Sequence, residues 1–238
     1  MAGRFLEYRV FFREFRRNFY STGAISPSSC FLARALARYV KRPLNNGQAP
    51  ANGGRRILEV GPGTGAVTRH ILAALQAGDT LDLVELNDAF VQLLQERLAS
   101  DPYFSPHADR VRVLHQKVED MPPEAQYDLV ISGLPLNNFP VPAVEAILAT
   151  LQRLVKPGGV LSYFEYVALR RIKACMCRPA ERQRLQGVGR VTGEALRQFE
   201  IRRDCVMFNA PPAWVHHLQF AQPEIPPAAP GVTSQAST

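Results

Sequence analysis

The chain has few of the residues from which metal centres and disulfide frameworks are built. It contains four cysteines among 238 residues, and none of them forms a Cys-x-x-Cys pair. We therefore expect reduced thiols and no metal site. No apolar run approaches the roughly 20 residues that a helix needs to span a bilayer. The arginines near the start of the chain are also atypical of a cleavable signal peptide, so we expect a cytoplasmic protein.

The bulk composition is ordinary for a globular domain, with 46% hydrophobic and 21% charged residues. The net charge of +7, in contrast, is unevenly distributed. Residues 1–42 carry nine basic and two acidic side chains, whereas the remaining 19 basic and 19 acidic side chains cancel. The excess of positive charge at the beginning of the chain predicts an anionic partner for that segment.

Residues 4–19 have the pattern of an amphipathic helix. Aromatic side chains recur there at spacings of three and four, which places them on one helical face. They are Phe5, Tyr8, Phe12, Phe15 and Phe19, and the other side is filled largely by Arg9, Arg13, Arg16 and Arg17. A basic aromatic helix of this kind is typical of a membrane interface, although a stripe of phenylalanines is also typical of a helix packed in a core.

Turn-forming residues divide the chain into four expected parts. These are an N-terminal amphipathic helix with a pocket-covering helical segment (1–42), a linker (43–54), the main domain (55–222) and a disordered tail (223–238). Within the first part, Ser28 or Ser29 is expected to cap a helix that runs to about Val40.

Apolar strands and amphipathic helices alternate through the main domain. The predicted strands span 56–60, 81–86, 110–115, 127–132, 158–166, 200–208 and 214–220. The predicted helices span 64–77, 88–99, 142–155 and 192–199. This alternation predicts an α/β, Rossmann-like fold with a mostly parallel seven-stranded sheet and helices on both faces.

The sequence ILEVGPGTGAVTRHIL at 57–72 predicts a ligand-binding loop between a strand and a helix that begins near Thr64. Its glycines, Gly61, Gly63 and Gly65, allow a tight turn and a close approach of the backbone to a ligand. Their spacing is G-x-G-x-G, whereas dinucleotide-binding loops have G-x-G-x-x-G. Glu59, just before the loop, suits a ligand with a cationic amino group.

Acidic residues also follow the next two predicted strands. Glu85 is followed by Leu86 in the sequence LVELN, and a carboxylate at this point can accept both ribose hydroxyls. Glu119 and Asp120 follow the third strand and could reach an adenine amino group. Lys117 stands in this segment where an acidic residue would be expected.

Taken together, these features resemble class I methyltransferases, and the resemblance implies S-adenosylmethionine as cofactor. A dinucleotide dehydrogenase is the alternative for such a loop. The predicted cofactor-binding residues are Thr22, Ser28, Glu59, Gly61, Gly63, Thr64, Gly65, Glu85, Leu86, Glu119, Asp120, Ser132 and Gly133.

The fourth predicted strand runs into DLVISGLPLNNFP at 128–140, beside the expected position of the reactive methyl group. Amino-methyltransferases keep an Asn/Asp-Pro-Pro-aromatic or Asn-Leu-Pro-Tyr motif at this point. Here Gly133 replaces the amide side chain and Leu136 the stacking ring, which argues against a nucleobase substrate. The glycine loop nevertheless resembles that of ribosomal RNA adenine dimethylases, so an RNA adenine N6-methyltransferase stays as the alternative.

A wider set of segments resembles bacterial phospholipid N-methyltransferases. Besides the basic aromatic helix, these segments are TGAISPSS (22–29), EVGPGTGAVT (59–68), VELN (84–87), SGLPLNNFP (132–140), SYFEYVALR (162–170) and NAPPAWVHHL (209–218). The resemblance implies methylation of phosphatidylethanolamine and its mono- and dimethyl forms, leading to phosphatidylcholine. It also implies peripheral association with the inner face of the cell membrane, and no nucleic acid partner is expected.

Four residues are candidates for contact with the substrate. Glu165, at the end of the fifth predicted strand, could accept the proton that the amine loses, or it could be a supporting acid further from the chemistry. Tyr20 could hold a methylated cation by cation–π attraction, or simply pack. Ser132 and the carbonyl of Leu134 could accept hydrogen bonds from the amine. A basic stretch at 170–184 either lies on the same membrane or is a solvated loop.

Overall fold

The computed structural model describes residues 29–41, 54–124, 126–166, 179–209 and 211–220. The predicted amphipathic helix at 4–19 and the predicted tail at 223–238 lie outside these residues, as does nearly all of the predicted linker. None of the helices within the described ranges is long and apolar enough to cross a bilayer.

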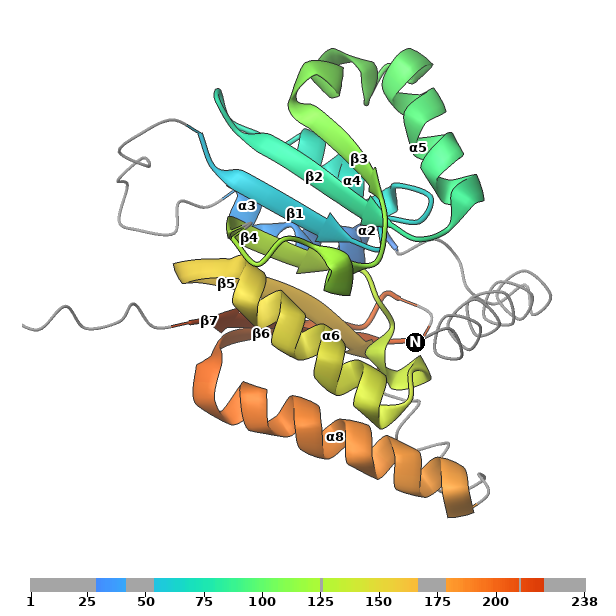
Figure 1. Cartoon of the computed structure of the whole chain (residues 1–238), viewed down its shortest axis with the longest axis vertical. Coiled ribbons are helices and arrows are strands. Elements are labelled where there is room, and N and C mark those ends of the chain that lie inside the picture. Colours follow the sequence, from blue (N-terminus) through green and yellow to red (C-terminus); the bar gives the residue numbers. More distant parts are fainter. Residues whose placement is uncertain (1–28, 42–53, 125, 167–178, 210, 221–238) are drawn as a thin grey trace, which may run out of the picture.

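The core of the molecule is one seven-stranded sheet with the order β3-β2-β1-β4-β5-β7-β6 (Figure 1). The strands are β1 (Arg56–Val60), β2 (Thr80–Glu85), β3 (Val111–His115), β4 (Tyr127–Ser132), β5 (Val155–Tyr166), β6 (Glu200–Val206) and β7 (Ala213–Gln219). The first five strands in this order pair in parallel, and β7 is antiparallel to both β5 and β6. The predicted mostly parallel sheet is confirmed, and β5 begins three residues earlier than expected.

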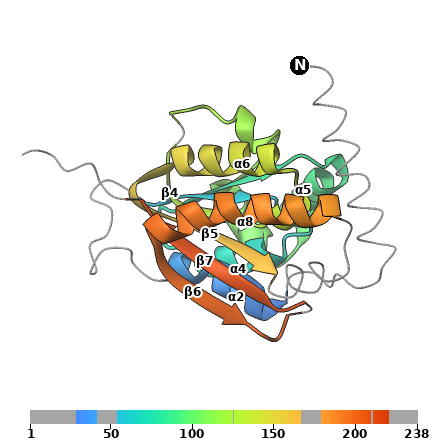
Figure 2. The ribbon, with the colours of Figure 1, turned by 90° about the horizontal axis from the view of Figure 1, so that it is seen from below.

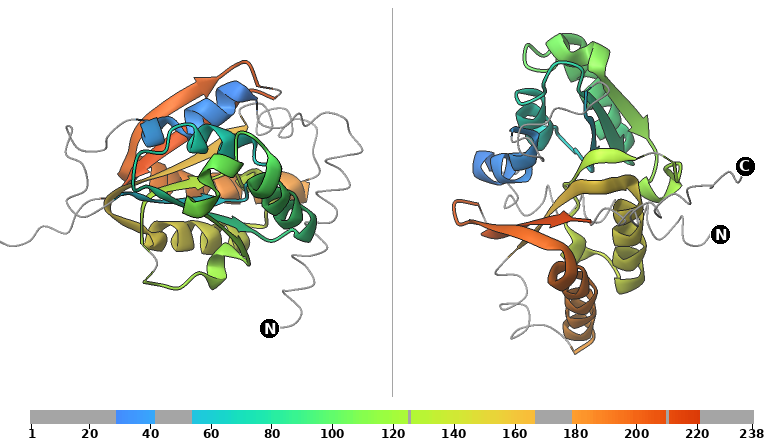
Figure 3. Two further views of the ribbon diagram at one scale, coloured as in Figure 1. Left: turned by 90° about the horizontal axis from the view of Figure 1, so that it is seen from above. Right: turned by 90° about the vertical axis from the view of Figure 1, so that its left-hand side faces the viewer.

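Helices cover both faces of the sheet, as the views in Figure 2 and Figure 3 show. The α-helices are α2 (Cys30–Leu36), α3 (Arg38–Lys41), α4 (Ala66–Leu72), α5 (Asp88–Ser100), α6 (Val141–Leu154) and α8 (Pro179–Phe199). Short 3-10 turns are η1 (Ser105–Arg110), η2 (Val118–Asp120) and η3 (Leu136–Asn138). Apolar residues of α2, α4 and α5 form one buried cluster against the sheet, and those of α6 and α8 form a second cluster on the opposite face.

Two predicted helix boundaries are wrong. The last helix begins at Pro179 and not at residue 192, because burial outweighs the low helix propensity of its three glycines. Leu185 and Val188 are buried, and Gly187 lets α8 approach α6 so closely that an added Cβ would lie 2.7 Å from a methyl of Val141. Helix α4 ends at Leu72, five residues before the predicted end, and turns follow it.

The start of α2 is capped by Ser29, one of the two serines that the sequence offered. The amide of Leu32 donates to the Ser29 hydroxyl at 3.2 Å. Because the first five strands of the sheet are parallel, their carboxyl ends meet at one edge. This edge carries Glu59, Glu85, Ser132 and Glu165, and we call it the carboxyl edge.

Candidate cofactor and substrate site

The glycine loop adopts a conformation that only glycines enter readily. Gly61, Gly63 and Gly65 have φ angles of 69°, 56° and 80°. A Cβ on Gly61 would lie 2.6 Å from a methyl of Leu134, whereas a Cβ on Gly63 would meet nothing within 4 Å. The loop therefore packs closely at Gly61 and borders open space at Gly63.

Glu59 is a buried carboxyl group with half of its hydrogen-bonding capacity unused. The hydroxyl of Thr68 on α4 donates to Oε2 at 2.7 Å, while Oε1 has no partner among the described residues. Burial raises the pKa of Glu59 to about 8, and the neighbouring charge of Glu85 raises it further against the hydrogen bond from Thr68. A cationic group beside Oε1 would reverse this preference for the neutral form.

Glu85 links the end of β2 to the glycine loop, a contact that the sequence did not reveal. Its Oε2 accepts the amide of Gly63 at 3.1 Å, and its Oε1 accepts those of Leu86 and Asn87 at 2.8 and 2.9 Å. Burial raises the pKa of this carboxyl group, and the three amides oppose the shift. An ionised carboxylate offers about four acceptor positions, so a ribose hydroxyl could still bind it.

An open hollow of about 370 Å³ lies next to these two acids at the carboxyl edge. Of the predicted residues, Gly61, Glu85, Leu86, Glu119 and Leu134 line it. Val118 and Phe139, which the prediction did not include, form part of its apolar wall. An apolar lining that also includes the carboxylates of Glu85 and Glu119 suits a flat base joined to a sugar.

The remaining predicted cofactor residues are near the hollow or outside the described part of the chain. Thr64 belongs to the glycine loop but does not line the hollow, and Asp120 is exposed. Thr22 and Ser28 lie outside the described residues, as does Tyr20. Lys117 lines the hollow where an acid was expected.

Gly133 brings the end of β4 against the glycine loop. Its amide donates to the carbonyl of Val60 at 2.8 Å, and an added Cβ would lie 2.7 Å from the carbonyl oxygen of Gly61. That oxygen is backbone and cannot move aside without shifting the loop. A side chain at this position would therefore require the glycine loop to shift, and this applies to the amide side chain expected from the motif of amino-methyltransferases.

Polar groups flank Gly133 in the same segment. Ser132 is fully buried, and its hydroxyl accepts the amide of Leu134 at 3.4 Å. Asn137 is 4% exposed, and its Oδ1 has no partner among the described residues. The sequence interpretation did not single out Asn137, although it lies within the motif. A buried amide oxygen without a donor indicates a place where a ligand N–H could bind.

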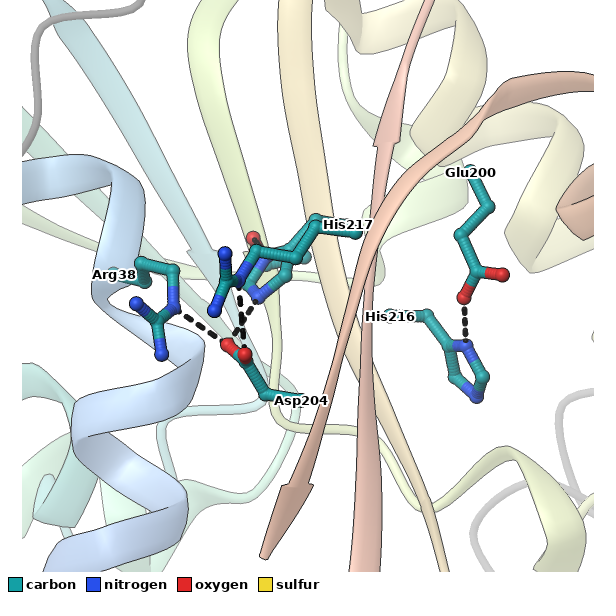
Figure 4. A network of polar contacts seen from close by, with 7 residues as sticks. Arg38, Glu200, Asp204, His216 and His217 are labelled. Atoms are coloured by element: carbon teal, nitrogen blue, oxygen red, sulfur yellow. Dashed lines mark hydrogen bonds and ion pairs between the residues drawn. The ribbon is translucent and has the colours of Figure 1, made fainter.

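Glu165 lies at the end of β5, two residues beyond Tyr163, which pairs with Ser132. Its Oε2 is 4.0 Å from Nε2 of His216 on β7, and Nδ1 of the same ring is 2.6 Å from Oε1 of Glu200. Nε2 of His216 is buried and makes no hydrogen bond among the described residues. The His216 ring thus lies between Glu165 and the half-buried Glu200, and Figure 4 shows its contact with Glu200.

The neighbouring His217 points to the opposite face of the sheet, into a separate network (Figure 4). Its Nδ1 is 2.7 Å from the hydroxyl of Ser162 and its Nε2 is 3.3 Å from Asp204, which also binds Arg38 of α3. A Ser-His-Asp row can serve hydrolysis, but here Ser162 and His217 are 2% and 0% exposed. Burial also lowers the pKa of His217 to about 4, against the pull of Asp204. The network therefore joins α3 to the sheet.

The residues of the site fit S-adenosylmethionine. The amino group of the cofactor would meet the unpartnered oxygen of Glu59, the ribose would meet Glu85, and the adenine would enter the apolar hollow beside Glu119. Glycines at 61 and 63 let the backbone approach such a ligand. Among the described residues no cluster of histidine, cysteine or acidic side chains could hold a metal ion.

Comparison with known proteins agrees with this geometry. Residues 57–159 match a family model described as a methyltransferase domain. Ornithine lipid N-methyltransferase from Singulisphaera acidiphila is 26% identical over 156 residues, which cover 66% of this chain and 76% of that protein. Ribosomal RNA small subunit methyltransferase A from Parasynechococcus marenigrum is 35% identical over 102 residues, which cover 43% of this chain and 32% of that protein. The second match thus spans about a third of that protein.

Solved structures share the fold over nearly the whole chain. An O-methyltransferase from Bacillus cereus, in complex with S-adenosylhomocysteine, has a TM-score of 0.55 at 15% identity and covers 88% of this chain and 90% of that one. TomG from Streptomyces achromogenes, in complex with S-adenosylmethionine, has a TM-score of 0.51 at 18% identity and covers 85% and 95%. S-adenosylmethionine is the cofactor, as predicted.

Proposed function

We propose that this class I S-adenosylmethionine-dependent methyltransferase transfers methyl groups to the amine of a membrane lipid. The substrate we propose is phosphatidylethanolamine together with its mono- and dimethyl forms, and the final product is phosphatidylcholine. The enzyme would work at the inner face of the cell membrane. Its predicted N-terminal helix, outside the described residues, would bind the anionic surface.

The observation that carries this proposal is the absence of room for a side chain at Gly133. The motif of amino-methyltransferases has an amide side chain at this position. Here even a Cβ would lie 2.7 Å from the Gly61 carbonyl oxygen. Leu136, at the position of the stacking ring, is buried in the core and does not line the hollow. A flexible aliphatic amine needs neither the amide nor the ring.

The comparison with ornithine lipid N-methyltransferase supports a lipid amine. That match extends over 66% of this chain and 76% of that protein. The ribosomal RNA methyltransferase is more nearly identical, but over only 43% of this chain. A shared glycine loop at the cofactor site would account for this shorter match to the ribosomal RNA methyltransferase.

The chemistry requires little of the protein beyond placement and the removal of a proton. The neutral amine nitrogen attacks the methyl carbon, the bond from carbon to sulfur breaks, and the sulfonium becomes a neutral thioether. Positive charge passes from sulfur to nitrogen, so catalysis rests on alignment and on exclusion of water. Ser132, the Leu134 carbonyl and Asn137 Oδ1 would accept hydrogen bonds from the amine.

Glu165 would take the proton that leaves the nitrogen. It lies at the carboxyl edge on the same face of the sheet as the hollow. His216, 4.0 Å away, and then Glu200 would pass the proton toward solvent, since Glu200 is the most exposed of the three side chains. Tyr20, outside the described residues, would stack on the methylated cation as the charge becomes permanent.

The deciding experiment measures the transfer of labelled methyl from S-adenosylmethionine to vesicles of phosphatidylethanolamine and phosphatidylglycerol, with the lipids then separated by chromatography. We expect label in the mono-, di- and trimethylated lipids. Ribosomal RNA lacking its native methyl groups is the competing acceptor. Label in RNA and none in lipid would overturn the proposal and favour the RNA adenine N6-methyltransferase.

Two variants make this assay specific. Glu85→Ala, at the cofactor site, should abolish transfer to every acceptor. Phe12→Ser with Phe15→Ser should lower vesicle binding and leave cofactor binding intact, because these residues belong to the predicted amphipathic helix. Unchanged vesicle binding in the double variant would contradict the proposal that this helix binds the membrane.

A further inference from the structure

An exposed apolar cluster lies outside the cofactor site, where α2 meets the turn after β6. Phe31, Met207 and Phe208 are 49%, 64% and 80% exposed. The rings of Phe31 and Phe208 contact each other, with centroids 5.6 Å apart. Three adjoining large apolar side chains on a surface indicate an interaction site and not scattered exposure.

The cluster sits at the carboxyl edge of the sheet. Both β5 and β6 are antiparallel to β7, so β6 runs in the direction of β5 and ends at the edge that carries the cofactor site. The beginning of α2 is held to the same turn, because the amide of Ser29 donates to Asn209 Oδ1 at 3.1 Å. Figure 2 shows the end of β6 beside α2.

Positive charge borders the cluster along α2 and α3. Arg34 of α2 and Lys41 of α3 are exposed, and they line with Phe31 and Phe208 a groove of about 920 Å³ between these helices and β6. Arg38, the first residue of α3, also lines this groove and binds Asp204. The charges of Arg34 and Lys41 add to burial in lowering the pKa of His70.

We propose that Phe31, Met207, Phe208, Arg34 and Lys41 form a second membrane-docking surface, separate from the predicted N-terminal helix, whose partner is the headgroup region of an anionic bilayer. The apolar side chains would insert at the boundary between headgroups and acyl chains, and the two cations would bind lipid phosphates. The inference rests on the proposed lipid substrate.

The chemistry and the position of this surface favour a bilayer over a protein partner. Exposed phenylalanines flanked by Arg and Lys match the layers of a membrane, which is anionic at the surface and apolar beneath. The location at the carboxyl edge places the bilayer on the side from which a lipid amine must approach the methyl group. The Arg38–Asp204–His217 network would hold α3, which directly follows α2, in fixed register with the sheet.

The test measures flotation of the full-length protein with vesicles of phosphatidylcholine and phosphatidylglycerol. For Phe31→Ser with Phe208→Ser we expect vesicle affinity to fall by about tenfold or more, since two apolar side chains lose their burial. For Arg34→Gln with Lys41→Gln we expect about fivefold for each charge. Phe208→Ser alone changes the most exposed side chain and leaves α2 unaltered, so a loss of affinity in this variant does not come from misfolding of α2.

Ile201→Ser is the matched control. Ile201 is a 47% exposed apolar side chain on the same strand, but at its beginning, away from the carboxyl edge. We expect it to bind vesicles as the unchanged protein does. Equal loss in the control, or unchanged binding in all the surface variants, would overturn the docking surface.

A second readout separates this inference from the proposed function. A short-chain phosphatidylethanolamine kept below its micelle concentration presents the amine without a bilayer. The surface variants should lose transfer to vesicles and keep transfer to the soluble lipid, and loss on both would contradict a docking function. Absence of transfer to either form in the unchanged enzyme would refute the lipid substrate, while flotation would still decide whether the surface binds membranes.

Discussion

The two edges of the sheet treat buried carboxylates in opposite ways. Toward the strand beginnings, Asp79 receives two hydrogen bonds from the guanidinium of Arg55 and one from its backbone amide. Asp82 receives two from Arg112 and one from the Tyr127 hydroxyl. At the carboxyl edge, Glu59 accepts the Thr68 hydroxyl and Glu85 accepts backbone amides, and within the described residues neither accepts a hydrogen bond from an arginine or a lysine.

The pKa values follow the same division. Burial alone would raise the pKa of Asp79, but its bonds to Arg55 hold it below the usual value. Burial raises the pKa of both Glu59 and Glu85, and the hydrogen bonds that oppose it come from Thr68 and from backbone amides, with a smaller contribution from the charge of His115 at Glu85. A buried acid that is fully paired serves the fold, whereas a buried acid left without a cation is suited to a ligand that brings hydroxyls or positive charge.

The largest effect should be on stability and should come from breaking the buried Asp79–Arg55 pair near the strand beginnings. Asp79→Ala leaves Arg55 buried without its carboxylate, and we expect a loss of about 3–5 kcal/mol in unfolding free energy. Denaturant unfolding measures it. Asp88→Ala, which removes an exposed partner of His115, should cost less than about 1 kcal/mol. Similar losses in both variants would contradict the assigned difference between buried and exposed pairs.

The next effect concerns ligand affinity and not stability. Glu85→Ala removes the acceptor for the ribose hydroxyls, and hydrogen bonds to charged groups are worth about 1.5–3 kcal/mol each. We expect S-adenosylmethionine to bind about 100-fold more weakly by calorimetry. Glu85→Gln keeps one acceptor oxygen and should lose about tenfold. Unchanged affinity in the alanine variant would remove Glu85 from the cofactor site.

A smaller effect appears as a dependence of cofactor affinity on pH. With a pKa of about 8, Glu59 is protonated at neutral pH in the free protein, and a cationic ligand would release that proton. Affinity should rise with pH by up to about tenfold per unit and level off near pH 8. Glu59→Gln should abolish this rise in affinity. The variant therefore distinguishes titration of Glu59 from titration of the cofactor's own amine. The same slope in both proteins would count against contact between Glu59 and the amine.

The stability of the cofactor-free protein should depend on pH through Glu59 at alkaline pH and through His217 at acid pH. The pKa of Glu59 is raised, so its contribution is complete below pH 4.5 and is lost as pH rises through about 8. The pKa of His217 is lowered, so its contribution is complete above pH 6.5 and is lost as pH falls through about 4. In thermal melts, Glu59→Gln should flatten only the alkaline side and His217→Phe only the acid side.

The sequence was most informative where the chemistry follows strand order. Glu59 and Glu85 directly precede loops at the ends of apolar strands, and parallel strands bring such ends to one edge. The glycine spacing and the seven strands could be recognised for the same reason, since each depends on residues close in sequence. The start of α8 could not, because its glycines favour a loop until Gly187 is packed against Val141.

Sequence alone therefore determined the sheet, the cofactor and the position of Glu59 and Glu85 at the carboxyl edge, because periodicity and strand-end position are local properties of the chain. Only the tertiary structure decided that Gly133 has no room for a side chain, since the obstacle is the carbonyl of Gly61, a residue of another strand-end loop. It also placed Phe31 against Phe208 and Ser29 against Asn209. These two pairs are 177 and 180 positions apart in the sequence. They meet because β6 ends at the carboxyl edge beside the start of α2, and no local sequence pattern encodes that arrangement.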